Sequence, residues 1–187
     1  MTDQRRIRVL YDEAAIAARN ESLVQEIKAA DMRDLLVVAV LKGSFMFAAD
    51  LIRAMHRAGL SPQVEFVHLS SYRDAMVSSG QVEILRDVQS EVRGRDVLLV
   101  DDILESGRTL AYAKDLMAAR GARHVLSVVL LEKPGKRAVQ IKADFVGFRC
   151  PDYFVVGYGM DVAHSFRQLP FVGVVETHAD TAQFDGV

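Results

Sequence analysis

The chain has 187 residues, of which 50% are hydrophobic and 26% are charged, and its formal net charge is −2. This length predicts one domain over residues 1–187 that buries a core without disulfides, and the hydrophobic content excludes an extended disordered protein. The small net charge gives no reason to expect nucleic acid as the main partner, and a single cysteine excludes an internal disulfide framework.

The N-terminus and the apolar runs predict a cytoplasmic protein with no membrane association. Residues 1–6 lack the apolar core of a signal peptide. The longest apolar run, residues 35–41, is far shorter than the ~20 residues that span a bilayer. Cys150 has neither a histidine nor a second cysteine as a neighbour, so we expect a buried structural thiol.

Apolar spacing predicts alternating helices and strands. In chain order these are a helix over 14–30, a strand over 35–41, a helix over 45–58, strands over 64–72, 81–85 and 96–100, a helix over 109–120, a strand over 124–131 and short β-rich segments over 145–176. Such alternation is typical of an α/β fold with a mainly parallel central sheet and helices on both faces.

The most informative segment is residues 97–110. An apolar run there ends in two adjacent carboxylates, Asp101 and Asp102, and Glu105 then leads into the turn Ser106-Gly107-Arg108-Thr109. In an open α/β sheet the ligand crevice lies beyond the carboxyl ends of the strands. Backbone N–H groups, hydroxyls and a helix N-terminus in this turn predict an anion site. Carboxylates beside it suggest a sugar phosphate held through its hydroxyls, with a divalent metal.

This segment resembles the 5-phosphoribosyl 1-pyrophosphate (PRPP) motif of type I phosphoribosyltransferases. The resemblance implies that Asp101 and Asp102 meet the ribose hydroxyls, directly or through metal, and that residues 105–109 bind the 5′-phosphate. The family usually carries Asp where this chain has Glu105. We expect Glu105 to be the acid or base at the N7 side of a purine; the alternative is that Glu105 turns outward and Asp102 or a water carries the proton.

Two further segments resemble parts of the same family that bind pyrophosphate. Lys42-Gly43 after a buried strand could be an ordinary helix-start turn, but it resembles the pyrophosphate loop, in which a non-proline cis peptide precedes the lysine. Ser71 and Tyr72, followed by the polar stretch 73–80, resemble the long mobile loop that closes over pyrophosphate and excludes water.

The C-terminal third resembles the base-binding part of the hypoxanthine-guanine branch. By themselves, Phe154 would be expected in a core and Lys133 at a solvated strand end. The resemblance instead implies that Lys133 donates to the purine 6-oxo group, Phe154 stacks on the base and the backbone of Val155 reads its edge. It also implies that Asp161 serves metal, that Arg167 meets pyrophosphate, and that a small hood of N- and C-terminal segments covers the base site.

We therefore expect purine salvage, in which hypoxanthine and PRPP give the nucleoside 5′-monophosphate and pyrophosphate. The implied cofactor is Mg²⁺, bound by Asp101, Asp102 and Asp161, and the implied assembly is a homodimer or homotetramer. Use of guanine stays open. The alternatives are a xanthine-preferring enzyme and an RNA-binding regulator of pyrimidine operons with the same fold, whose motif can carry the equivalents of Leu104 and Arg108. The absence of a basic cluster argues against the regulator.

Overall fold

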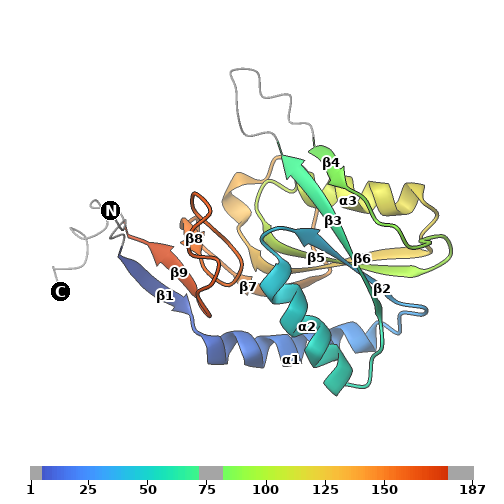
Figure 1. The fold of residues 1–187 in the computed structure, drawn as a ribbon, viewed down its shortest axis with the longest axis horizontal. Helices are drawn as coiled ribbons and strands as arrows, with labels where there is room; N and C mark the ends of the chain where they lie inside the picture. The colour runs from blue at the N-terminus through green and yellow to red at the C-terminus, as the bar shows by residue number, and fades with distance from the viewer. Residues whose placement is uncertain (1–5, 72–81, 177–187) are drawn as a thin grey trace.

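The computed structural model describes residues 6–71 and 82–176 (Figure 1). In chain order the elements are β1 (Ile7–Tyr11), α1 (Glu13–Ala29), β2 (Leu36–Leu41), α2 (Phe45–Arg57), β3 (Gln63–Ser71), β4 (Val82–Arg86), β5 (Asp96–Leu104), α3 (Arg108–Ala119), β6 (His124–Glu132), the 3-10 helix η1 (Pro134–Lys136), β7 (Phe145–Arg149), β8 (Val155–Val156) and β9 (Val172–Val175). Most bounds fall within one or two residues of those predicted from the sequence.

The central sheet has six strands in the order β4-β3-β2-β5-β6-β7. All neighbours are parallel except β3 and β4, so the predicted mainly parallel α/β sheet is confirmed. The two strands at its centre, β2 and β5, are paired from Leu36↔Val97 to Ala39↔Val100. The functional segments follow the carboxyl ends of these strands, which therefore lie at one edge of the sheet.

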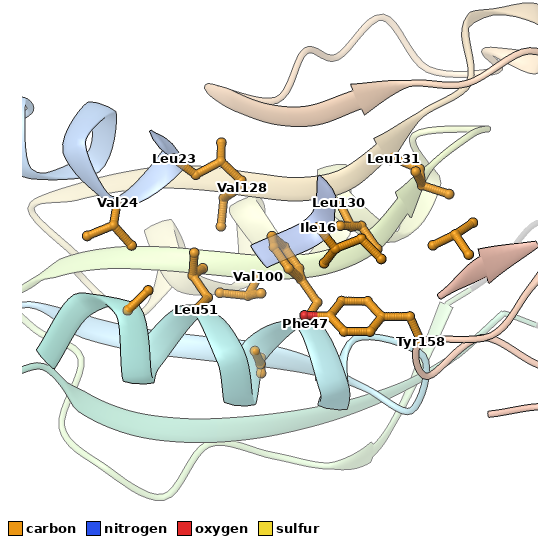
Figure 2. Packing of buried hydrophobic residues seen from close by; sticks show 14 of the residues in the cluster. Ile16, Leu23, Val24, Phe47, Leu51, Val100, Val128, Leu130, Leu131 and Tyr158 are labelled. Atoms are coloured by element: carbon orange, nitrogen blue, oxygen red, sulfur yellow. The ribbon is translucent and has the colours of Figure 1, made fainter. Parts of the chain in front are cut away.

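Alternating side chains of the central strands build one core on each face of the sheet. Val37 and Ala39 of β2 point to the face covered by α1 and α2, whereas Leu36 and Val38 point to the face covered by α3. Figure 2 shows how side chains of α1 and α2 pack around Val100 and Val128 on the first face. Because both faces are covered, the strands are apolar on both sides, as the continuous runs predicted.

The predicted end of the motif strand is wrong. Residues 96–100 were expected to form the strand and the acidic pair to follow it, but β5 continues to Leu104 and includes Asp101 and Asp102. The cause is its neighbour β6, which is long enough to pair with β5 as far as Leu104↔Glu132, whereas the pairing with β2 stops at Val100. The acidic pair therefore lies in a stretch of β5 that pairs with β6 on one side only, and it borders the cleft.

A second sheet, β1-β9-β8, joins the two ends of the described chain. Ile7 pairs with Val175, and Val155 pairs with Val174, all antiparallel. The hood implied by the resemblance is thus present, and Figure 1 shows it beside the central sheet with β1 and β9 side by side. The sequence analysis assigned no strand to residues 7–11, because this short strand depends on a partner at the far end of the chain.

Two further expectations concern exposure. No helix in residues 6–71 and 82–176 is long and apolar enough to cross a membrane. Cys150 is buried and free, as expected, and burial raises the pKa of its thiol. A buried thiol of raised pKa is a poor nucleophile.

At the edge of the sheet opposite the cleft, Asp96 at the start of β5 has three polar partners. Its buried carboxylate accepts hydrogen bonds from Arg123 Nη2 at 2.6 Å, from the Arg33 backbone N–H at 2.6 Å and lies 2.9 Å from His124 Nδ1. The Arg123 hydrogen bond is the largest cause that lowers the pKa of Asp96 well below its usual range. The charged form of Asp96 therefore stabilises the folded state.

Replacing Asp96 with Asn is expected to lower the free energy of unfolding by about 3 kcal/mol at pH 7, because Arg123 loses its buried partner. A carboxylate whose pKa is lowered by folding stabilises fully above its unfolded pKa of about 3.9 and loses this contribution as the pH falls toward the folded value. Urea unfolding at several pH values from 7 to 3 should therefore show the gap between parent and Asp96→Asn narrowing below about pH 5. The exposed carboxylate Asp115 on α3 provides a matched Asp→Asn control, expected within ~0.5 kcal/mol of the parent. A gap independent of pH would contradict the assignment.

Candidate active site

Two adjoining cavities, of about 510 and 640 Å³, lie at the carboxyl edge of the central sheet. They share several lining residues and so form one cleft; the shared residues are Leu41, Lys42, Gly43, Leu69, Asp102, Ile103, Glu105 and Lys136. The first cavity continues along residues 106–109 and the second continues to the hood. The cleft therefore has two ends, which we call the phosphate end (residues 105–109) and the base end (Lys133, Phe154, Val155).

The phosphate end is a turn that leads into the N-terminus of α3. Gly107 has a φ of 84° and no room for a side chain, since an added Cβ would lie 2.7 Å from Ile141 Cγ2 and 3.0 Å from the Val139 carbonyl oxygen. Ser106, Gly107, Arg108 and Thr109 all line the cavity. The first N–H groups of a helix have no partner within it, and its dipole favours a negative charge there. The turn thus has the features of an anion site, and phosphate binding there stays a prediction.

The turn after β2 contacts two other parts of the site through glycines. The peptide bond between Leu41 and Lys42 is cis, as the resemblance implied. A Cβ on Gly43 would lie 1.8 Å from Asp102 Oδ2, and a Cβ on Gly159 would lie 2.2 Å from the Gly43 carbonyl oxygen. These close approaches bring the Lys42 turn, the acidic pair and the segment 157–161 together. Position 159 is restricted to glycine by the backbone contact and by its φ of 99°, whereas a Cβ at position 43 would require the Asp102 carboxylate to move.

The two adjacent carboxylates have different surroundings. Asp101 is 5% exposed and accepts a hydrogen bond from the Asp102 backbone N–H at 3.0 Å, whereas Asp102 is partly exposed and borders both cavities. Burial, followed by the nearby charge of Asp102, raises the pKa of Asp101 well above its usual range. Asp102 is thus the member of the pair with the wider access to the cleft.

At the base end, Lys133 follows β6 and is 6% exposed. Its Nζ donates to the Tyr153 carbonyl oxygen at 2.7 Å and lies 3.7 Å from Glu105 Oε1. The view of Lys133 as a solvated strand end is therefore wrong. Phe154 is 56% exposed and lines the cavity, so it is not a core residue and can offer a ring face to a ligand. Val155 beside it is buried in β8.

The segment 157–161 carries Asp161 into the same cavity. Tyr158 anchors this segment in the core, where Figure 2 shows its ring beside Phe47, and its hydroxyl donates to Asp50 Oδ2 at 2.6 Å. Arg167 Nη1 donates to the Gly159 carbonyl oxygen at 2.6 Å, and Arg167 Nη2 lies 2.7 Å from Asp161 Oδ1. Asp161 and Arg167 thus reach the cleft as an ion pair.

The donor chemistry of the cleft fits a hard divalent cation in part. Asp102 and Asp161 both line the base-end cavity, and carboxylate oxygens are ligands that Mg²⁺ prefers. Within the part of the chain that the structure describes, however, no three His, Cys, Asp or Glu side chains lie close enough to hold a metal by themselves. The ligand set Asp101, Asp102 and Asp161 therefore stays a prediction, and phosphate oxygens of a substrate would have to complete it.

The structure brings together all the predicted site residues that it describes in full. Tyr72 and the loop 73–80 lie outside the described residues, as does the side chain of Ser71. Lys136, which was not predicted, borders both cavities, and its Nζ lies 3.0 Å from Asp152 Oδ1. Its position three residues after Lys133, just beyond a buried strand, was the signal in the sequence.

Comparison with known proteins gives the following similarities. A family model described as a phosphoribosyl transferase domain matches residues 8–163. Hypoxanthine phosphoribosyltransferase of Escherichia coli K12 is 40% identical over 172 residues, which cover 90% of this chain and 95% of that protein. A solved structure of a hypoxanthine phosphoribosyltransferase from Staphylococcus aureus has a TM-score of 0.84 at 36% identity, covering 90% of this chain and 91% of that one.

A third relative is much longer than this chain. The bifunctional protein TilS/HprT of Listeria innocua is 44% identical over 170 residues, which cover 90% of this chain and 26% of that protein. The chain therefore spans about a quarter of this curated relative.

Replacing Gly43 with Ala is expected to destabilise the protein by about 1–3 kcal/mol, because the new methyl group overlaps the Asp102 carboxylate and forces it or the turn to shift. Gly135 provides the matched control, since an added Cβ there meets nothing within 4 Å. Thermal and urea unfolding of Gly43→Ala and Gly135→Ala measure the difference. Equal stability of the two variants would show that the close approach at Gly43 imposes no constraint.

Proposed function

Because the chain belongs to the phosphoribosyltransferase family, we propose that it is a purine salvage enzyme that converts hypoxanthine and PRPP to the nucleoside 5′-monophosphate and pyrophosphate. The observation that carries the proposal is the single cleft with a phosphate-binding turn at one end and Lys133 and Phe154 at the other. The names of the E. coli and S. aureus relatives support the choice of base.

Lys133 and Phe154 support a 6-oxopurine as the base. An ammonium group has three N–H donors, of which Tyr153 accepts one. A further donor can bind the 6-oxo oxygen of hypoxanthine or guanine, while Phe154 stacks on the ring. Adenine carries an amino group at the same place, so the remaining N–H donors of Lys133 would face another donor instead of an acceptor. A site that hydrogen-bonds a substrate group rejects analogues without it strongly.

The rest of the cleft supports PRPP as the other substrate. Residues 105–109 would bind its 5′-phosphate, and Asp101 and Asp102 would accept hydrogen bonds from the ribose hydroxyls. Lys42, the Gly43 backbone and Arg167 would stabilise the pyrophosphate as it leaves. Ser71 and Tyr72 are proposed to close over pyrophosphate on the basis of the sequence resemblance alone.

In the reaction, the purine N9 forms a bond to the anomeric carbon as the bond from that carbon to the pyrophosphate oxygen breaks. The electron pair leaves with pyrophosphate, positive charge builds on the ribose, and the purine gives up one proton. Glu105 lies beside Lys133 in the cleft, where its carboxylate can accept that proton from the N7 side of the base. Mg²⁺, when bound by the aspartates and the substrate, would neutralise charge on the leaving pyrophosphate.

We also propose a cytoplasmic location and a homodimer or homotetramer, on the same resemblance.

The proposed reaction is tested with purified protein, PRPP and Mg²⁺ and each of hypoxanthine, guanine, xanthine, adenine and uracil. Hypoxanthine is expected to give product and adenine almost none, and excess chelator should abolish turnover until Mg²⁺ is restored. Preference for xanthine would favour that branch instead. No turnover with any base, together with RNA binding that weakens steeply with salt, would favour the RNA-binding regulator.

Glu105→Gln is expected to lower kcat by about 10²–10⁴-fold, the usual worth of a positioned acid or base. Glu105→Asp keeps a carboxylate and serves as the matched control, expected to retain much of the activity. Steady-state kinetics with PRPP binding measured separately give the comparison. If Glu105→Gln turns over nearly as fast as the parent while it binds PRPP normally, Glu105 is not the base.

A further inference from the structure

Arg137 lies directly behind the phosphate end, outside the residues that line the cleft. Its side chain is 14% exposed. One guanidinium nitrogen, Nη1, donates to the Glu105 carbonyl oxygen at 3.0 Å, and the other, Nη2, donates to Glu132 Oε1 at 3.3 Å. Arg137 therefore connects the backbone of the phosphate-binding turn to the end of β6, immediately before Lys133.

The residues after Arg137 extend this support, and we call residues 137–141 the backing segment. The backbone N–H groups of Ala138 and Val139 both donate to the Ser106 carbonyl oxygen, at 2.9 and 3.1 Å. Ile141 and Val139 then occupy the space beside Gly107. Two successive carbonyls of the turn, those of Glu105 and Ser106, are thus held from behind by the backing segment.

Holding these carbonyls also fixes the direction of the N–H groups. In a planar trans peptide the N–H points opposite to the C=O of the same unit. The Glu105 carbonyl shares its peptide unit with the Ser106 N–H, and the Ser106 carbonyl shares its unit with the Gly107 N–H. When the backing segment holds both carbonyls, both N–H groups point away from it. Ser106 and Gly107 line the cavity, as does Ala138 of the backing segment. Among the described residues no backbone acceptor binds the Ser106 or Gly107 N–H group, so both groups remain available to an anion there.

We propose that Arg137 is a positioning residue for phosphate binding, which acts through the peptide unit between Glu105 and Ser106. The proposal rests on the proposed function, because it takes the anion to be the 5′-phosphate of the substrate and product. Arginine suits the role because the two terminal nitrogens of its planar guanidinium donate to the Glu105 carbonyl and to the Glu132 carboxylate at the same time. A lysine ammonium, by contrast, is a point charge on a flexible side chain. The same bond fixes the backbone from which the Glu105 side chain projects toward Lys133.

The test compares Arg137→Met with Arg137→Lys and with Arg149→Met as a matched control. Arg149 is the other arginine beside Glu132, with Nε 3.7 Å from Oε2, but its side chain is 89% exposed and no described hydrogen bond joins it to residues 105–109. The ligands are inosine 5′-monophosphate and inosine, which differ only in the phosphate, and their affinities are measured by calorimetry beside the melting temperature.

Arg137→Met is expected to weaken binding of inosine 5′-monophosphate by about tenfold or more, because the turn loses a hydrogen bond to a charged group. Binding of inosine should stay within about twofold of the parent, because inosine has no phosphate and makes no contact that depends on the direction of these N–H groups. Arg137→Lys should recover part of the loss, and Arg149→Met should match the parent. A merely structural role would weaken both ligands alike and lower the melting temperature in proportion.

Equal affinity of Arg137→Met and the parent for inosine 5′-monophosphate would overturn the proposal, and so would equal losses for both ligands. If Arg137→Met does not fold, the affinities of Arg137→Lys decide, because lysine keeps the positive charge but lacks the planar guanidinium. A loss confined to inosine 5′-monophosphate would then support the proposal, and unchanged affinity for it would overturn the proposal. If the parent binds both ligands yet forms no product from hypoxanthine and PRPP, the proposed reaction is wrong while the affinities still decide the role of Arg137.

Discussion

The contacts of Gly43 with the Asp102 side chain and with the Gly159 backbone are the constraint on which the site depends. The Gly43 backbone lies against the Asp102 carboxylate, which a Cβ at position 43 would displace, and Gly159 lies against the Gly43 carbonyl with no room for a Cβ. Strands β2 and β5 are neighbours in parallel register up to Ala39↔Val100, so their continuations run side by side. Residues 157–161, which follow the hood strand β8, contact the Gly43 carbonyl through Gly159. Because of these contacts, the residues proposed to bind pyrophosphate, ribose and purine line one cleft.

Around this contact, polar side chains of the cleft are held by hydrogen bonds within the protein itself. Lys133 and Asp101 are both buried, and each has a defined hydrogen bond, to the Tyr153 carbonyl and from the Asp102 N–H. Burying a polar or charged group without a hydrogen-bond partner is costly, so these hydrogen bonds favour one position for each side chain. Fixed donors and acceptors need no reorganisation when charge develops in a reaction. The rigid core beneath, where Tyr158 anchors the segment 157–161, keeps Asp161 and Arg167 in the same arrangement.

Local patterns in the sequence were sufficient for much of the fold and the site. The apolar runs predicted the parallel strands, and the segment 97–110 indicated the turn proposed to bind phosphate because its residues are contiguous. Long-range pairing was not predictable in this way. Strand β1 depends on β9 at the other end of the chain, β5 is extended by the length of β6, and Arg137 contacts a backbone carbonyl, which no side-chain pattern reveals. The different burial of Asp101 and Asp102 follows from strand alternation, which places adjacent side chains on opposite faces.

We propose that one cleft binds the phosphate and the purine of a single nucleotide at its two ends. A crystal structure of the protein with inosine 5′-monophosphate tests it most directly. We expect the phosphate on the backbone N–H groups of residues 106–109, the ring stacked on Phe154 and the 6-oxo oxygen hydrogen-bonded to Lys133 Nζ. A nucleotide bound elsewhere, or bound with its base at the turn before α3 and its phosphate at Lys133, would show that the two ends of the cleft are wrongly assigned.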